Sequence, residues 1–281
     1  MEQYYSKIGL GSVQFGIDYG IANNQGQTSS KEVSKILDFA SQSGVSYVDT
    51  ASAYGTAEEV LGRNRVNRFN IVSKFMPASI GIAVSEQFQA SCTKLAVSDL
   101  YAYLAHRPLD LIKERSSWSF LQSEKEKGRI NKIGFSLNNP EELRQLATAG
   151  IEPDLIQVPY NFFDNRFRKQ LIELKNRGCE IHTRSTFLQG LFFMPPNSLP
   201  PFFDEVKGQM YNLQEEYGSG LAASLLKYVL DQEFVDVVIV GVNNVTQLKE
   251  NLERLKAAQA MKDITLQIDE NILMPSEWPS R

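Results

Sequence analysis

Eight short segments rich in branched and aromatic residues alternate along this chain with longer segments of helical periodicity, and this alternation constrains the fold most strongly. The candidate strands are residues 7–10, 45–50, 69–75, 100–105, 131–136, 154–160, 180–183 and 235–240. Strands that are separated by helices are typical of parallel β/α units. The sequence therefore predicts an α/β fold.

The segments between the strands carry the end signals of amphipathic helices. One helix is expected to begin at a capping Ser30 and to end at Gly44. Another has Pro140 in its first turn and Gly150 at its end. The proline-rich and apolar stretch 184–200 fits neither element and is expected to be a loop that folds over another part of the molecule.

Two architectures accommodate eight β/α units, a closed barrel and a doubly wound open sheet. An open sheet that binds a dinucleotide should have G-x-G-x-x-G directly after its first strand, at the start of a helix. Here GLGSVQFG occupies that place with a different glycine spacing, and no helix is expected before about residue 30. We therefore predict a single-domain (β/α)8 TIM barrel over residues 1–281, a length usual for this fold.

Composition excludes several classes of function. The net charge is only -4 and the basic residues are scattered, so nucleic acid is not an expected partner. No stretch has the length of a membrane span and the N-terminus lacks a signal pattern, so we expect a cytoplasmic protein and no membrane partner. Cys92 and Cys179 are expected to be structural thiols. No cluster of His, Cys and carboxylates has metal-ligand spacing, so no metal is expected.

Ionisable residues close three consecutive predicted strands. Asp49 ends the second, Lys74 ends the third and His106 follows the fourth, while Tyr54 lies on the loop after Asp49. In a barrel the ends of these strands meet at one mouth, where catalytic groups project.

Each of these residues also has a structural interpretation. Asp49 could cap a turn and Lys74 could be a solvated charge. Tyr54 could pack on the adjacent helix, and His106 could be a satisfied structural group. Their joint occurrence at neighbouring strand ends favours a catalytic set.

The pattern D-T-A-x-x-Y-G-T-x-E, followed by S-K at the next strand end and a histidine after the fourth strand, resembles the aldo-keto reductase family. The similarity continues through residues 128–143, 156–161 and 238–252. The opening SVQFGIDYGIANNQGQ is most similar to a bacterial branch associated with surface-sugar and polysaccharide pathways.

The resemblance implies reduction of an aldehyde or ketone, with a sugar derivative as one candidate, by hydride transfer from NAD(P)H with Tyr54 as the proton donor. A phenol has a pKa of about 10, and an adjacent ammonium stabilises the phenolate, which is the part expected of Lys74. Asp49 would hold Lys74 by its counter-charge. His106 would donate a hydrogen bond to the carbonyl oxygen.

The resemblance also implies a cofactor site. Its residues are Ser136, Gln157, Arg184, Ser185, Phe187, Gln189, Gly190, Gly241, Val242, Asn243, Gln247, Glu250 and Asn251. Two departures stand out, because Leu137 replaces an asparagine found in several members and Arg184 takes the place of an aromatic that stacks on the nicotinamide. NADP(H) is the first expectation on family grounds. NAD(H) is the second, since GVNNVTQ has no cation for a 2′-phosphate.

A small carbonyl compound is the expected partner, with Tyr19, Arg107 and Asn161 as candidate substrate residues, and the protein is expected to be a monomer or a small homo-oligomer. Trp278 near the C-terminus is weighed as a substrate wall against simple packing, and His182 as a structural residue. The alternative to an active reductase is a nicotinamide-binding redox sensor, catalytically weak, on the same barrel.

Overall fold

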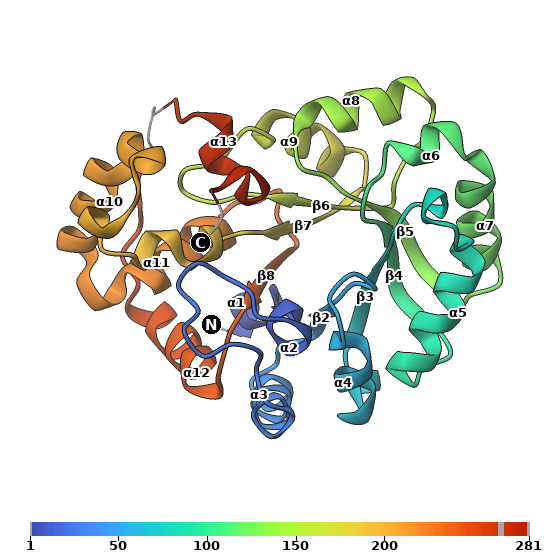
Figure 1. The fold of residues 1–281 in the computed structure, drawn as a ribbon, viewed down its shortest axis with the longest axis horizontal. Helices are drawn as coiled ribbons and strands as arrows, with labels where there is room; N and C mark the ends of the chain where they lie inside the picture. Colours follow the sequence, from blue (N-terminus) through green and yellow to red (C-terminus); the bar gives the residue numbers. More distant parts are fainter. Residues whose placement is uncertain (1, 264–266, 280–281) are drawn as a thin grey trace.

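The computed structural model describes residues 2–263 and 267–279. In the described part of the chain, eight parallel strands form a closed barrel in which each strand pairs with its sequence neighbours and β8 pairs with β1 (Figure 1). The strands are β1 (Ile8–Gly11), β2 (Tyr47–Asp49), β3 (Asn70–Phe75), β4 (Leu100–Ala105), β5 (Ile130–Ser136), β6 (Leu155–Pro159), β7 (Glu180–Arg184) and β8 (Val237–Gly241). The predicted TIM barrel is confirmed. Each strand begins and ends within two residues of its predicted position.

Helices pack around the strands, most of them on the outside of the barrel, as Figure 1 shows. They are α1 (Glu2–Ser6), α2 (Val13–Gly16), α3 (Ser30–Gln42), α4 (Ala57–Arg63), α5 (Val84–Leu95), α6 (Asp110–Lys113), α7 (Arg115–Glu126), α8 (Pro140–Thr148), α9 (Arg168–Asn176), α10 (Asp204–Tyr217), α11 (Leu221–Leu230), α12 (Val245–Arg254) and α13 (Glu270–Leu273). The stretch 184–200, expected to be a loop, contains the 3-10 segments η3 (Leu188–Phe193) and η4 (Pro196–Ser198).

Two of the predictions about the helices need correction. The cap of α3 is Ser29, not Ser30, because the Ser29 side chain accepts from the backbone N–H of Glu32. A short helix, α2, follows β1 almost at once, although no helix was expected before residue 30. The α8 start agrees with its sequence, since Asn139 and Glu142 form a capping box around Pro140.

Side chains alternate between the inside of the barrel and the layer beneath the helices. On β3, Ile71 packs in the large core under the helices, whereas Val72 packs with Ala102 and Leu104 in a separate small cluster. Since residues two apart share a face of a strand, Lys74 points inward like Val72. Polar groups at the strand ends therefore project into the mouth of the barrel.

Both cysteines are buried and free, in agreement with structural thiols. Within residues 2–263 and 267–279, none of the helices combines the length and apolar character needed to cross a bilayer.

Candidate active site

A buried ion pair joins the ends of β2 and β3. Nζ of Lys74, a side chain with no exposed surface, lies 2.6 Å from Oδ1 of Asp49. The same ammonium donates to the backbone oxygen of Thr50 over 2.9 Å and to the hydroxyl of Tyr54 over 3.5 Å. Burial by itself would lower the pKa of Lys74, but Asp49 and Tyr54 outweigh burial and raise it. The ammonium is therefore charged at neutral pH.

The second carboxylate oxygen of Asp49 is held from β6. Nε2 of the fully buried Gln157 donates to Oδ2 of Asp49 over 2.7 Å. Oε1 of Gln157 is buried and lacks a hydrogen-bond partner among the described residues. The amide thus fixes the carboxylate on one side and keeps an acceptor available on the other.

Tyr54 is positioned by a close contact between two backbone segments. A Cβ built on Gly16, the last residue of α2, would lie 1.7 Å from the carbonyl oxygen of Tyr54 and 2.6 Å from the backbone nitrogen of Ala57. Gly55 has φ of 56°, and a Cβ there would lie 2.6 Å from the Gly16 oxygen. A side chain at either position would clash with the backbone, and Tyr54 or the Gly16 segment would have to move.

His106 lies edge to face against Tyr54, with ring centroids 5.8 Å apart and planes at 86°. Its backbone N–H donates to the oxygen of Phe75 over 2.9 Å, which ties the residue to the end of β3. Burial, followed by the charges of Lys74 and Arg184, lowers the pKa of His106 to about 3. The imidazole is therefore neutral at neutral pH, with one nitrogen able to donate a hydrogen bond.

These residues lie along a pocket of about 750 Å³ at the C-terminal ends of the strands. Asp49, Tyr54 and His106 line one end. The other walls come from the loop between β1 and α3, the segment after β7, β8 with its connection to α12, and residues 273–276. This groove is large enough to hold a ligand of dinucleotide size.

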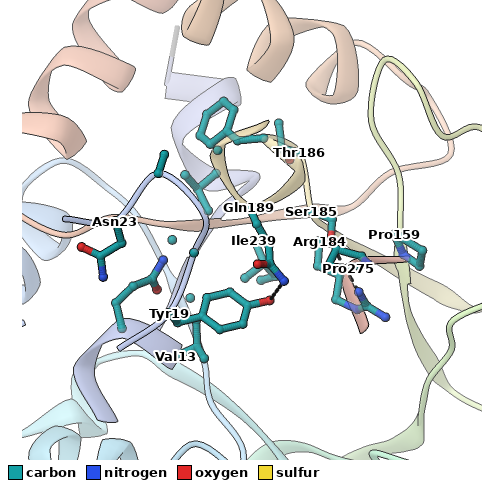
Figure 2. Close-up of a pocket in the computed structure, with 18 of the residues that line it drawn as sticks. Val13, Tyr19, Asn23, Pro159, Arg184, Ser185, Thr186, Gln189, Ile239 and Pro275 are labelled. Atoms are coloured by element: carbon teal, nitrogen blue, oxygen red, sulfur yellow. Dashed lines mark hydrogen bonds between the residues drawn. The ribbon is translucent and has the colours of Figure 1, made fainter. Parts of the chain in front are cut away.

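Two of these walls meet across the groove. Nε2 of Gln189 donates to the hydroxyl of Tyr19 over 2.9 Å, as Figure 2 shows. A Cβ on Gly190 would lie 2.6 Å from Cβ of Ala22. Ser185 and Gln189 have φ of 64° and 53°, a region that costs energy for residues other than glycine. The strained segment after β7 is thus held over the groove by the loop after β1.

Arg184 projects into the groove from the end of β7 (Figure 2). Nη2 donates to the backbone oxygen of Leu137 over 3.0 Å and to Oδ1 of Asn138 over 2.7 Å. Nη1 donates to Oγ of Ser185 over 3.3 Å. The guanidinium is thereby anchored to the β5–α8 connection at the catalytic end of the groove.

Most of the residues predicted for the site line this groove. They are Asp49, Tyr54, His106, Arg184, Ser185, Phe187, Gln189, Gly190, Gly241, Asn243, Gln247, Glu250, Asn251 and Tyr19. Lys74, Ser136, Gln157 and Val242 are buried behind the surface of the groove and are not part of its lining.

Three other residues are placed away from the expected substrate site. Asn161 is fully buried, its Oδ1 accepts from the backbone of Phe163 and its Nδ2 donates to the oxygen of Ser185, so its role is to hold a loop. Arg107 is exposed and does not line the groove. Trp278 packs edge-on against Phe203 and donates to the backbone of Ile272, so it is not a substrate wall.

Several lining residues were not anticipated from the sequence. They are Gln14, Asn23, Asn138, Phe193, Ala222 and the tail residues Leu273, Met274, Pro275 and Ser276. The tail does reach the groove, through residues that lie two to five positions before Trp278. Asn23 had a usable signal, because an Asn shortly before a glycine, as in the loop sequence NNQG, is typical of side chains that organise turns.

In the described part of the chain, no group of three His, Cys, Asp or Glu side chains is placed to hold a metal ion.

The sequence matches the family model "Aldo/keto reductase family" over residues 7–271, which is nearly the whole chain. The chain belongs to the aldo/keto reductase family. A curated relative, the uncharacterized oxidoreductase YqkF of Bacillus subtilis, is 24% identical over 92% of this chain and 90% of its own length. An aldo-keto reductase of Mycobacterium sp. (strain KMS) is 31% identical over 47% of this chain and 51% of that protein.

The fold is also shared with solved members of the family. The aldo-keto reductase AKR11C1 from Bacillus halodurans superposes with a TM-score of 0.70 at 19% identity, covering 91% of this chain and 88% of that one. Aldo-keto reductases act on small-molecule carbonyl compounds and are oxidoreductases, and membership places this chain in the same broad class.

Proposed function

We propose that the chain reduces an aldehyde or ketone to an alcohol with a nicotinamide dinucleotide, and that Tyr54 is the proton donor. The observation that carries the proposal is the Tyr54 hydroxyl, 3.5 Å from the buried Lys74 ammonium and facing a groove that His106 also lines. A phenol in contact with an ammonium can release its proton, because the resulting phenolate is stabilised by the charge.

The groups divide the chemistry between them. The carbonyl oxygen of the substrate lies between the Tyr54 hydroxyl and the neutral His106 N–H, which polarise it. Bound NAD(P)H supplies the hydride to the carbonyl carbon. The carbonyl π pair moves onto oxygen as the Tyr54 proton is transferred to it, and the products are the alcohol and the Tyr54 phenolate. Lys74 stabilises that phenolate and Asp49 holds Lys74 in place.

The residues present suit a nicotinamide dinucleotide. Oε1 of Gln157 and Oγ of Ser12 are buried polar atoms lacking hydrogen-bond partners among the described residues, and the family resemblance includes Gln157 in the cofactor site. The groove continues from there to the connection between β8 and α12, where Asn251 is exposed to it. Family grounds favour NADP(H), and the lack of cations in GVNNVTQ favours NAD(H).

The substrate is proposed to be a small hydroxylated or anionic carbonyl compound, a keto-sugar among them. Arg184 and Tyr19 are polar residues of the groove lining that could contact such a substrate.

Tyr54→Phe tests the proposal. We expect turnover of aldehydes and keto-sugars by the purified protein to fall by about 10²-fold or more, because the proton donor is lost. Cofactor affinity, measured by fluorescence titration, should stay unchanged. A variant as fast as the parent would show that the acid is misassigned, and tight cofactor binding without turnover on a broad panel would favour the redox-sensor alternative.

A further inference from the structure

The connection from β8 to α12 forms one part of the wall of the groove, which we take as the adenosine end. Gly241, Asn243, Gln247 and Glu250 line it. With the reacting ring at Tyr54, the adenosine half of a dinucleotide has to extend toward this end. The N-terminus of α12 is the natural anion-binding element here, since a helix start presents free N–H groups and a positive dipole end.

That N-terminus already holds an anion from the protein itself. Oε1 of Glu32, in the first turn of α3, accepts from the backbone N–H of Val245 over 2.9 Å. This hydrogen bond, followed by the one from Lys35, lowers the pKa of Glu32, so the carboxylate is charged at neutral pH. Two neighbouring N–H groups are also bound internally, Gln247 N to Oδ1 of Asn244 and Asn243 N to Oε1 of Gln247.

Compensating cations are absent from the described lining of the groove at this end. Arg184 is the sole lysine or arginine among the described lining residues, and it belongs to the catalytic end. Lys35 forms an exposed ion pair with Glu32 itself, with its Nζ 2.9 Å from Oε2, so it offsets part of that charge, and Lys249 lies 5.2 Å from the ring centroid of Phe39. Glu250 adds a second carboxylate to the wall.

We propose that Glu32 selects NAD(H) over NADP(H) by occupying the start of α12 with a carboxylate. A 2′-phosphate carries about two negative charges at neutral pH and would meet this carboxylate, whereas a 2′-hydroxyl is uncharged. The inference rests on the proposed function, and it reverses the order of preference suggested by the family resemblance.

Fluorescence titration of the purified protein with NADH and with NADPH tests this selection without any turnover. The unmodified protein should bind NADH about 10-fold or more tightly than NADPH. Glu32→Gln should leave NADH affinity within about twofold and tighten NADPH several-fold, because the amide oxygen can still accept from Val245 while the charge is gone.

Glu141→Gln is the matched control. Glu141 is also a first-turn carboxylate, in an i,i+3 ion pair with Arg144 at the start of α8, and it does not line the groove. This variant should leave both affinities unchanged. If NADPH affinity changed equally in Glu32→Gln and Glu141→Gln, the proposed role of Glu32 would be refuted.

Ionic strength provides a second test on the unmodified protein. Salt screens electrostatic repulsion. Raising the ionic strength from about 0.05 M to about 0.5 M should therefore reduce the difference between the affinities for NADH and NADPH. A gap that widens in favour of NADH would mean that the 2′-phosphate is held by attraction, and the inference would fail. NADPH binding as tightly as NADH would also refute it and leave the proposed function intact, whereas binding of neither cofactor would refute the proposed function itself.

Discussion

The two ends of the barrel carry the same kinds of side chain in different states. At the C-terminal mouth a carboxylate, a lysine, a tyrosine and a histidine surround a groove. Near the N-terminal ends of the strands a second group contains Glu180, Lys132, Tyr101 and His182. Both groups are built around a buried or half-buried acid–lysine pair, yet the chemistry available at the two ends is different.

In the second group every partner converges on one acid. The hydroxyl of Tyr101 lies 2.7 Å from Oε2 of Glu180, Nζ of Lys132 lies 2.9 Å from the same oxygen, and Nε2 of His182 lies 2.7 Å from Oε1. These hydrogen bonds outweigh burial and lower the pKa of Glu180 to about 2. The tyrosine here donates to a carboxylate, so it has no proton to offer to a ligand.

At the mouth the carboxylate of Asp49 pairs with Lys74, and the hydroxyl of Tyr54 faces the groove. Asp49 binds Lys74 and Gln157, and neither Tyr54 nor His106 donates to it. The four residue types therefore do not by themselves define a catalytic site. What distinguishes one is that its acid neutralises the lysine and leaves the phenol and the imidazole available to a ligand.

The largest expected effect comes from removing the lysine at each end. Lys74→Met should lower turnover by about 10³-fold, because the phenolate loses its charge partner. It should also cost about 3–5 kcal/mol of unfolding free energy, since Asp49 is left as a buried unpaired charge. The matched change Lys132→Met should leave turnover within twofold and lower stability less, because Lys132 is partly exposed and Glu180 keeps two partners. Steady-state kinetics and denaturant unfolding separate the two, and equal losses of turnover would erase the distinction between the ends.

Displacing the phenol without removing it should have the next largest effect. Gly16→Ala puts a Cβ 1.7 Å from the backbone oxygen of Tyr54, so Tyr54 has to shift relative to Lys74. A misplacement of about 1 Å can cost about 10²-fold in rate. Gly208→Ala on α10 is the control, because a Cβ there meets nothing within 4 Å. If Gly16→Ala retained parental turnover, the contact would not position Tyr54.

The contrast between the ends also shows what could be read from the sequence. Asp49, Lys74 and His106 were predicted because each follows a recognisable strand, and the closing geometry of a barrel brings strand ends together. Asn161 follows β6 in the same way and was wrongly placed in the substrate site. Its side chain turns away to bind backbone groups, which depends on the path of a loop and not on strand periodicity.

Contacts between segments distant in the chain were beyond the sequence. The contribution of Pro275 and the contact of Glu32 with Val245 join parts of the chain more than 200 residues apart, and no local pattern encodes them. The second group was invisible for the same reason, since Tyr101 and Glu180 are 79 residues apart and look like ordinary strand residues.

Acid should weaken the two ends in pH windows that begin at different pH values. The folded-state pKa of His106 is lowered to about 3 from an ordinary value near 6.5, so the unfolded chain binds the extra proton and stability falls as pH drops below about 6.5. The pKa of Glu180 is lowered to about 2, so the stability it provides is present above about 4.5 and is lost as pH falls through about 2.

Denaturant unfolding between pH 7 and pH 3 checks these windows. In the parent, protonation of the unfolded chain at His106 should lower the free energy of unfolding by about 1.4 kcal/mol per pH unit below about pH 6.5, a few kcal/mol in all. His106→Gln should abolish this decrease. Glu180→Gln should reduce the pH dependence of the unfolding free energy only below about pH 4.5. A His106→Gln curve parallel to that of the parent would mean that the imidazole is not held neutral at the mouth.

The smallest expected effect is that of Tyr101→Phe, the counterpart of Tyr54→Phe. Removing this hydroxyl deletes one of three hydrogen bonds to Glu180, and we expect a loss of about 1–2 kcal/mol in unfolding free energy. Turnover should not change, because this phenol donates to a carboxylate on the far side of the barrel from the groove. Tyr54→Phe should therefore lower the turnover rate, and Tyr101→Phe should lower the unfolding free energy. A fall in turnover by Tyr101→Phe that survives correction for the folded fraction would mean that the two ends communicate through the barrel interior, and the lower group would then act on the mouth instead of only bracing the strands.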